Sequence, residues 1–260
     1  MVAQRVRKIA CKARVDLHSK RYRELAEKYD ISGYKRVYCV HIRKTGGTSL
    51  NNMFFSLSGA KGSILQQQIR HTKDHRIVHN GKIYVGWNAC YINGGHYFYG
   101  YSHIPLHKLK LPKKTFTVTC FRDPVKRVVS HYNMLMGFRE NGIKRPCMRV
   151  EGKWLGNRFE DFLDRIPSRH LMNQLYMFSA SYDVEEAVDR AARLSHYFFA
   201  RDFQSGIDKL NNKTGLALKP VHVHKSAYQE DIPEDTLVRL RDMLDSEYRF
   251  LERVKKLKVA

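Results

Sequence analysis

One short run of residues constrains the fold of this chain most strongly. Residues Arg36-Val-Tyr-Cys-Val-His-Ile42 are rich in β-branched and aromatic side chains and lack a regular alternation of apolar with polar positions. Such a run is typical of a strand that is buried on both faces of a parallel sheet. The runs Lys114–Phe121 and His196–Ala200 have the same character. The sequence therefore predicts three buried strands.

Each predicted strand is followed by a loop and then by a helical pattern. These helices are expected at Thr48–Leu57, Pro124–Met136 and Phe203–Leu210. Repeated strand-then-helix units indicate an α/β fold, with a parallel sheet flanked by helices. A chain of 260 residues with 43% hydrophobic and 12% aromatic residues is long enough to build one core of this kind, so we expect a single domain.

The rest of the chain is less sharply patterned. We expect a basic, helical N-terminal extension over residues 1–35 and the main domain over residues 36–260. Extra strands or loops are expected between Lys82 and His103, and helices over Phe159–Ala187. Ile232–Leu257 has the apolar periodicity of one long amphipathic helix.

Charge and cysteine content narrow the partners and the compartment. Lys and Arg total 47 against 25 Asp and Glu, a formal charge of +22, which predicts an anionic partner. No stretch reaches the roughly 18 apolar residues of a spanning helix, and the first residues lack the apolar run of a signal peptide. The five cysteines form no Cys-x-x-Cys pair. We therefore expect no membrane span, a reducing compartment and a cytoplasmic location.

The strongest chemical signal is the segment His41-Ile-Arg-Lys-Thr-Gly-Gly-Thr-Ser-Leu50, where a strand ends and a helix begins. Gly46 and Gly47 allow the backbone N–H groups to curl around an anion, the helix N-terminus adds positive potential, and Lys44 adds a full charge. Further hydroxyl donors are Thr45, Thr48 and Ser49. The segment therefore predicts a phosphate-binding loop.

This loop differs from the magnesium-nucleotide loop of kinases and ATPases. That loop places its lysine directly after the last glycine and a hydroxyl residue next to the lysine. Here Lys44 precedes both glycines. The order of residues disfavours a nucleotide kinase and favours a phosphate loop with a different leaving group.

A second signal follows the second predicted strand, at Phe121-Arg-Asp-Pro-Val-Lys-Arg-Val-Val-Ser-His-Tyr132. Asp123 is suited to cap the following helix and Pro124 to occupy its first position. The spacing places Asp123, Arg127 and Ser130 on one face of that helix, away from the core. Arg122 and Ser130 are therefore candidates for holding a second phosphate group.

The two segments together resemble the PAPS-dependent carbohydrate sulfotransferases, most closely the heparan sulfate 2-O- and 6-O-sulfotransferases and their prokaryotic relatives. Lys44-Thr-Gly-Gly-Thr-Ser-Leu50 is similar to the family's 5′-phosphosulfate loop, and Arg122–Ser130 to its 3′-phosphate motif. The resemblance implies a P-loop-like sheet and a metal-free transfer from PAPS that leaves the product PAP. It implies that Lys44 contacts the phosphosulfate and that Arg122 and Ser130 bind the 3′-phosphate.

The likeness is specific from about Val37 to Tyr132 and weaker beyond. A basic residue followed by a hydroxyl late in the chain often closes over the cofactor in this family, which indicates Lys225 and Ser226. The family also has a histidine base between its two motifs. His103 is the best match and His96 the alternative.

We accordingly expect PAPS as the anionic cosubstrate and a glycan or other hydroxyl compound as the acceptor, with no metal and no nucleic acid. Two other functions stay open at this stage. One is a P-loop nucleotide kinase or phosphotransferase, and the other is a non-enzymatic polyanion-binding protein. The acceptor and the oligomeric state are not specified by these motifs.

Overall fold

The computed structural model describes residues 19–220 and 228–257. Contacts within the chain group these residues into two compact units, neither of which is continuous in sequence. Unit 1 contains the described residues up to His41, Gly47–Cys120, and the described segment from Leu194. Unit 2 contains Ile42–Gly46, Phe121–Arg193, and the described residues from 228 onward.

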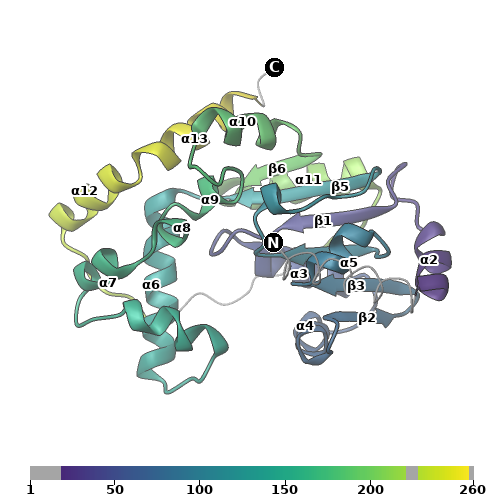
Figure 1. Ribbon diagram of the computed structural model, residues 1–260, viewed down its shortest axis with the longest axis horizontal. Helices are drawn as coiled ribbons and strands as arrows, with labels where there is room; N and C mark the ends of the chain where they lie inside the picture. The colour runs from purple at the N-terminus through teal and green to yellow at the C-terminus, as the bar shows by residue number, and fades with distance from the viewer. Residues whose placement is uncertain (1–18, 221–227, 258–260) are drawn as a thin grey trace, which may run out of the picture. The chain divides into compact units, whose positions relative to one another are not determined.

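Unit 1 is built on a six-stranded sheet with the strand order β2-β3-β4-β1-β5-β6 (Figure 1). The pairs β3–β4, β4–β1 and β1–β5 are parallel, whereas β2 and β3 form an antiparallel hairpin. The strands are β1 (Arg36–Val40), β2 (Arg76–His79), β3 (Lys82–Gly86), β4 (Tyr99–Ser102), β5 (Thr115–Phe121, its last residue grouped with unit 2) and β6 (His196–Phe199). The predicted α/β class and the three predicted strands are confirmed.

The helices of unit 1 follow the strands as expected. They are α2 (Ser19–Glu27), α3 (Gly47–Ser56), α4 (Gly62–His71), α5 (Ala89–Gly94) and α11 (Phe203–Thr214), with 3₁₀ turns at Leu106–Lys108 and Ala200–Asp202. The core lies between α3 and the sheet, where Phe54 stacks on Tyr99 with ring centroids 4.1 Å apart. After its first residue β1 is completely buried, and β4 is buried throughout. Burial on both faces explains why these strands lack polar alternation.

Unit 2 consists of helices. They are α6 (Pro124–Glu140), α7 (Phe159–Arg165), α8 (Ser168–Leu171), α9 (Asn173–Tyr176), α10 (Val184–Ala192), α12 (Glu234–Met243) and α13 (Asp245–Leu257), with 3₁₀ turns at Pro146–Arg149 and Glu151–Trp154. The side chain of Asp123 accepts a hydrogen bond from the backbone N–H of Lys126, and Pro124 opens α6, as predicted. Tyr132 and Phe159 contribute to a separate apolar core.

Two expectations about the helices of unit 2 are wrong. The chain from Ile232 to Leu257 forms two helices, because α12 ends before Leu244 and α13 begins at Asp245. Leu240 and Leu244 are both buried in the core, so the apolar periodicity continues across the break and hides it. Arg127 does not share an exposed face with Asp123 but is completely buried.

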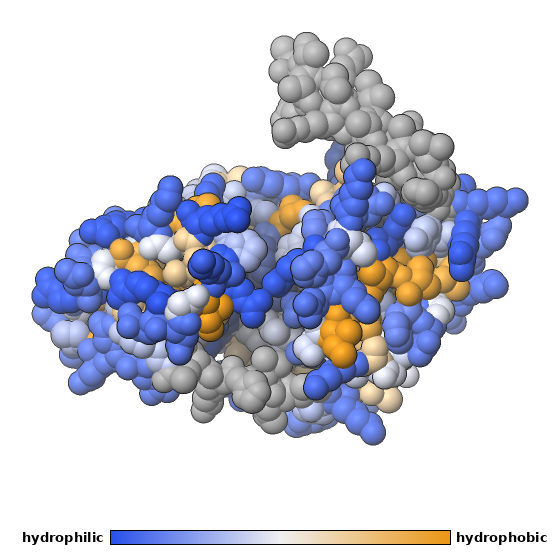
Figure 2. Space-filling model, turned by 90° about the horizontal axis from the view of Figure 1, so that it is seen from below, coloured by the Kyte–Doolittle hydropathy of each residue, from blue (hydrophilic) through white to orange (hydrophobic). Residues whose placement is uncertain are grey.

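The surface, the helices and the cysteines can be compared with the expectations of a basic protein without a membrane span in a reducing compartment. Figure 2 shows a face on which hydrophilic residues predominate, as expected from the excess of basic residues. No helix within residues 19–220 and 228–257 is long and apolar enough to cross a membrane. Cys39, Cys120 and Cys147 are not joined in disulfides, whereas Cys90 is disulfide-bonded. A disulfide is more typical of an oxidising compartment, so the cysteines do not support a reducing one.

Candidate functional site

The order of strands in unit 1 directs attention to the carboxyl ends of β1 and β5. From β1 the chain builds β3 and β4 on one side of β1 and then crosses to β5 on the other side. Open α/β sheets bind ligands outside the carboxyl ends of the strands at such a reversal of strand order. The two predicted phosphate motifs begin at these two strand ends, directly after β1 and β5.

His103 lies at this carboxyl edge because it directly follows β4, which is parallel to β1 and pairs Ser102 with Val40. The Nδ1 atom of His103 is 2.6 Å from the carbonyl oxygen of His41, and the two imidazole rings have centroids 4.4 Å apart. A carbonyl only accepts hydrogen bonds, so Nδ1 carries the hydrogen. In the neutral ring Nε2 therefore holds the lone pair that a general base needs.

His96 lies at the opposite edge of the sheet, because it precedes β4 and therefore stands at the amino ends of the parallel strands. Burial lowers the pKa of His96, and the nearby charges of Arg23, Arg36 and Arg76 lower it further. These arginines belong to α2, β1 and β2, none of which carries a predicted phosphate motif at that edge. The position of His96 is thus remote from the carboxyl ends of β1 and β4.

The start of α3 is shaped by His41. A Cβ atom on Gly47 would lie only 2.1 Å from the His41 ring, so only glycine fits there. Asn51 of α3 donates from Nδ2 to Nδ1 of His41 over 3.3 Å, and its Oδ1 accepts a 2.7 Å hydrogen bond from the Tyr99 hydroxyl. The imidazole therefore packs tightly on the first turn of α3, which also carries the exposed Thr48 and the half-buried Ser49.

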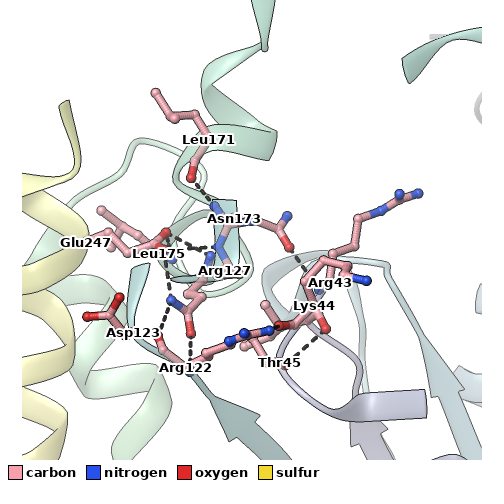
Figure 3. A network of polar contacts seen from close by, with 12 residues as sticks. Arg43, Lys44, Thr45, Arg122, Asp123, Arg127, Leu171, Asn173, Leu175 and Glu247 are labelled. Carbon is pink, nitrogen blue, oxygen red and sulfur yellow. Dashed lines mark hydrogen bonds and ion pairs between the residues drawn. The ribbon is translucent and has the colours of Figure 1, made fainter. Parts of the chain in front are cut away.

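Residues Ile42–Gly46 of the first motif belong to unit 2, where they contact the second motif. The Arg122 guanidinium donates from Nη1 to the carbonyl oxygen of Lys44 over 3.0 Å (Figure 3). Lys44 has φ +65° and Gly46 has φ +100°, so the backbone of this loop is left-handed at two positions. The structure thus brings together the principal cationic residues of the two predicted phosphate motifs.

The charges around Lys44 change its ionisation. Burial, reinforced by the charges of Arg122 and Arg43, lowers the pKa of Lys44 to about 8. The charges of Lys44 and Arg122 therefore lie close together, and the positive potential that they create favours an anion. Figure 3 shows the Lys44 and Arg43 side chains extending from the loop on the side away from Glu247.

The other residues predicted to bind the cofactor are Thr45, Ser130, Lys225 and Ser226, and their surroundings differ. The Thr45 hydroxyl donates to the carbonyl oxygen of Ile42 over 3.1 Å and Thr45 is buried, so this hydroxyl closes the loop itself, and its predicted contact with a ligand finds no support. Ser130 lies on α6 and is half-buried. Lys225 and Ser226 lie outside the described residues.

A buried glutamine holds Arg122, and the sequence patterns did not indicate it. Oε1 of Gln174 accepts a hydrogen bond from the Arg122 backbone N–H over 2.9 Å, and Nε2 donates to the Arg122 carbonyl over 2.9 Å. Nε2 also donates to Oε1 of Glu247 over 2.9 Å. These residues are 52 and 73 positions apart in the chain, a separation at which no local spacing signals contact.

Arg43 belongs to a second group that the sequence patterns missed. Its Nη1 lies 2.7 Å from a carboxylate oxygen of Glu151, whose Oε2 accepts a 2.9 Å hydrogen bond from Nε2 of His131. Burial raises the pKa of Glu151, but the hydrogen bond from His131 and the charge of Arg43 outweigh it and bring the pKa below its ordinary value. Glu151 is therefore ionised and neutralises the charge of Arg43.

Comparison with known proteins adds no identification. A scan against models of known protein families found no match, and a search of curated proteins found none either. Within the described part of the chain, no group of three or more His, Cys, Asp or Glu side chains is arranged to hold a metal ion.

Proposed function

We propose that this chain is a PAPS-dependent sulfotransferase that moves a sulfuryl group to an acceptor hydroxyl, with a carbohydrate as the expected acceptor class. The observation that carries the proposal is the hydrogen bond from Arg122 to the carbonyl of Lys44. It joins the two motifs that resemble the two phosphate-binding elements of the family. The donor set is suited to a doubly phosphorylated nucleotide, since it combines an ammonium, a guanidinium and left-handed loop backbone.

The roles of the residues follow from their chemistry. In the transfer, a bond forms between the acceptor oxygen and sulfur while the bond from sulfur to the 5′-phosphate oxygen breaks, and PAP leaves. Nε2 of His103 takes the proton of the acceptor hydroxyl. The ammonium of Lys44 stabilises the negative charge that develops on the leaving phosphate, and Arg122 with Ser130 binds the 3′-phosphate.

PAP should stabilise the folded protein without magnesium. A ligand that binds only the folded state at about a hundred times its dissociation constant adds about 2.7 kcal/mol. For a chain of this size that corresponds to a rise in melting temperature of roughly 5 to 10 °C. ATP with magnesium should give a much smaller rise. Equal rises from both ligands, or a rise only with magnesium, would favour a kinase.

Substitutions of Arg122 and Ser130 test whether the second motif binds the 3′-phosphate of PAP. Arg122→Ala should weaken PAP binding by about 1.5 to 3 kcal/mol, because it removes a charge-assisted hydrogen bond, and Ser130→Ala should weaken it less. AMP, which lacks the 3′-phosphate, should bind both variants nearly as well as the wild type. A binding protein for polyanions in general would lose affinity for both nucleotides equally, with a dependence on salt alone.

PAP affinity should also depend on pH through Lys44. Its pKa of about 8 in the free protein means that the ammonium is lost as the pH rises through that value. A bound phosphate favours the ammonium form, so binding takes up a proton above pH 8, and affinity should fall by up to about tenfold per pH unit there. Phosphate groups with a second pKa of about 6 are already dianionic and add no such fall.

The matched control is Lys44→Arg, which keeps a positive charge throughout this range because a guanidinium does not deprotonate. Calorimetric titrations at about pH 7.5 and 9.5 should show the loss of affinity in the wild type and a nearly flat profile in Lys44→Arg. A flat profile in the wild type would exclude Lys44 as a charged contact of the ligand.

A further inference from the structure

The side-chain amide of Gln174 pairs with the backbone of a single residue. It is completely buried, and it bonds both the N–H and the C=O of Arg122. A neighbouring strand would satisfy the same two groups in a sheet. Arg122 is the first residue after β5. The Gln174 side chain therefore makes, directly after the end of the strand, the two backbone hydrogen bonds that a neighbouring strand would make within the sheet.

Glu247 fixes the direction of this amide. Its Oε1 accepts a hydrogen bond from Nε2 of Gln174, and its Oε2 accepts hydrogen bonds from the backbone N–H groups of Gln174 at 2.9 Å and Leu175 at 3.3 Å. A reversed amide would turn its oxygen toward the carboxylate and toward the Arg122 carbonyl, and its NH₂ toward the Arg122 N–H. All three contacts would then be repulsive, so only one orientation is compatible with the site.

We infer that Gln174, oriented by Glu247, is a positioning residue for the anion site at Arg122 and Lys44. The amide fixes the Arg122 backbone, and this directs the guanidinium to the Lys44 carbonyl (Figure 3). In this role Gln174 acts on the ligand through Arg122. The inference rests on the proposed function for the identity of the ligand, but the anion site itself can be tested with simpler anions.

A double-variant cycle with PAP distinguishes positioning from general support of the fold. Gln174→Met, which has a similar size and no amide, should weaken PAP binding by about tenfold, in the direction of Arg122→Ala. If Gln174 acts through the guanidinium, adding Gln174→Met to Arg122→Ala should change the affinity by no more than about twofold. Independent effects that multiply in the double variant would overturn the inference.

The matched control is Thr236→Val in α12 of the same unit, which removes a 2.7 Å hydrogen bond to Glu160 from a buried threonine. It should lower the melting temperature without changing PAP affinity. Hydrogen exchange gives a readout without ligand, since the Arg122 amide should exchange faster in Gln174→Met and at the wild-type rate in Thr236→Val. Unchanged exchange at Arg122 in Gln174→Met would contradict the inference.

A second variant and a simpler anion separate a failure of this inference from a failure of the proposed function. If Gln174→Met does not fold, Gln174→Asn retains an amide that is one methylene too short for both backbone groups, and the same cycle applies to it. If the wild type binds inorganic pyrophosphate but not PAP, the proposed function fails, and the cycle run with pyrophosphate still decides the inference. If the wild type binds neither anion, both the anion site and the role of Gln174 are wrong.

Discussion

Replacing His103 with alanine is expected to slow sulfuryl transfer by about 10²- to 10⁴-fold, the usual contribution of general-base catalysis. PAP affinity and melting temperature should stay near their wild-type values, because His103 is assigned to the acceptor hydroxyl and not to the nucleotide. His103 is suited to act as the base because its Nδ1–H donates to the His41 carbonyl, which leaves the lone pair on Nε2. Single-turnover rates and calorimetric titrations with PAP measure the two quantities separately.

His96→Ala is the matched control, since His96 was the alternative base and lies at the amino edge of the sheet. Its effect on the rate should be small. Near-normal transfer by His103→Ala together with loss of transfer in His96→Ala would show that the base has been assigned to the wrong histidine. If neither substitution slows transfer, another group takes the proton.

Replacing Arg127 with methionine is expected to destabilise the protein by about 3 to 5 kcal/mol, because it leaves the carboxylate of Glu247 buried without its cationic partner. Both side chains are completely buried, and Nε of Arg127 lies 3.4 Å from Oε1 of Glu247. The guanidinium also donates to the carbonyl oxygens of His170 and Leu171. At about 2 to 4 °C per kcal/mol for a chain of this size, the melting temperature should fall by about 10 °C.

The double variant Arg127→Met/Glu247→Gln provides the control. It removes the uncompensated charge, so it should be more stable than Arg127→Met alone, although the carbonyl oxygens of His170 and Leu171 still lack their donor. Scanning calorimetry of the wild type and the variants measures these differences. A loss of less than about 1 kcal/mol in Arg127→Met would show that water or a rearranged neighbour compensates Glu247.

The features that could be predicted from the sequence are the local ones. β1, β5 and β6 are visible because strands buried on both faces have continuous apolar runs, and α6 is visible through Asp123 and Pro124 at its start. The two predicted phosphate motifs also consist of neighbouring residues at strand-to-helix turns, and the structure has these turns. Their binding of phosphate stays a prediction.

The features that could not be predicted depend on contacts between distant residues. Helical spacing put Arg127 on an exposed face, but a carboxylate 120 residues away, Glu247, makes its burial possible. Gln174 gave no signal because its partners, Arg122 and Glu247, are 52 and 73 residues away in the chain. The division into two units was also hidden, because the segments of each unit are interleaved along the chain.

This interleaving limits how the protein can be divided. The five residues Ile42–Gly46 belong to unit 2, although the residues on both sides of them belong to unit 1. No single cut in the polypeptide therefore separates the units, and a fragment ending before Phe121 would retain the Lys44 loop without the helices that support it. During synthesis, the loop emerges about 200 residues before the helix that carries Glu247, at a rate of roughly 5 to 20 residues per second. The proposed anion site is consequently expected to be completed only after Glu247 has left the ribosome.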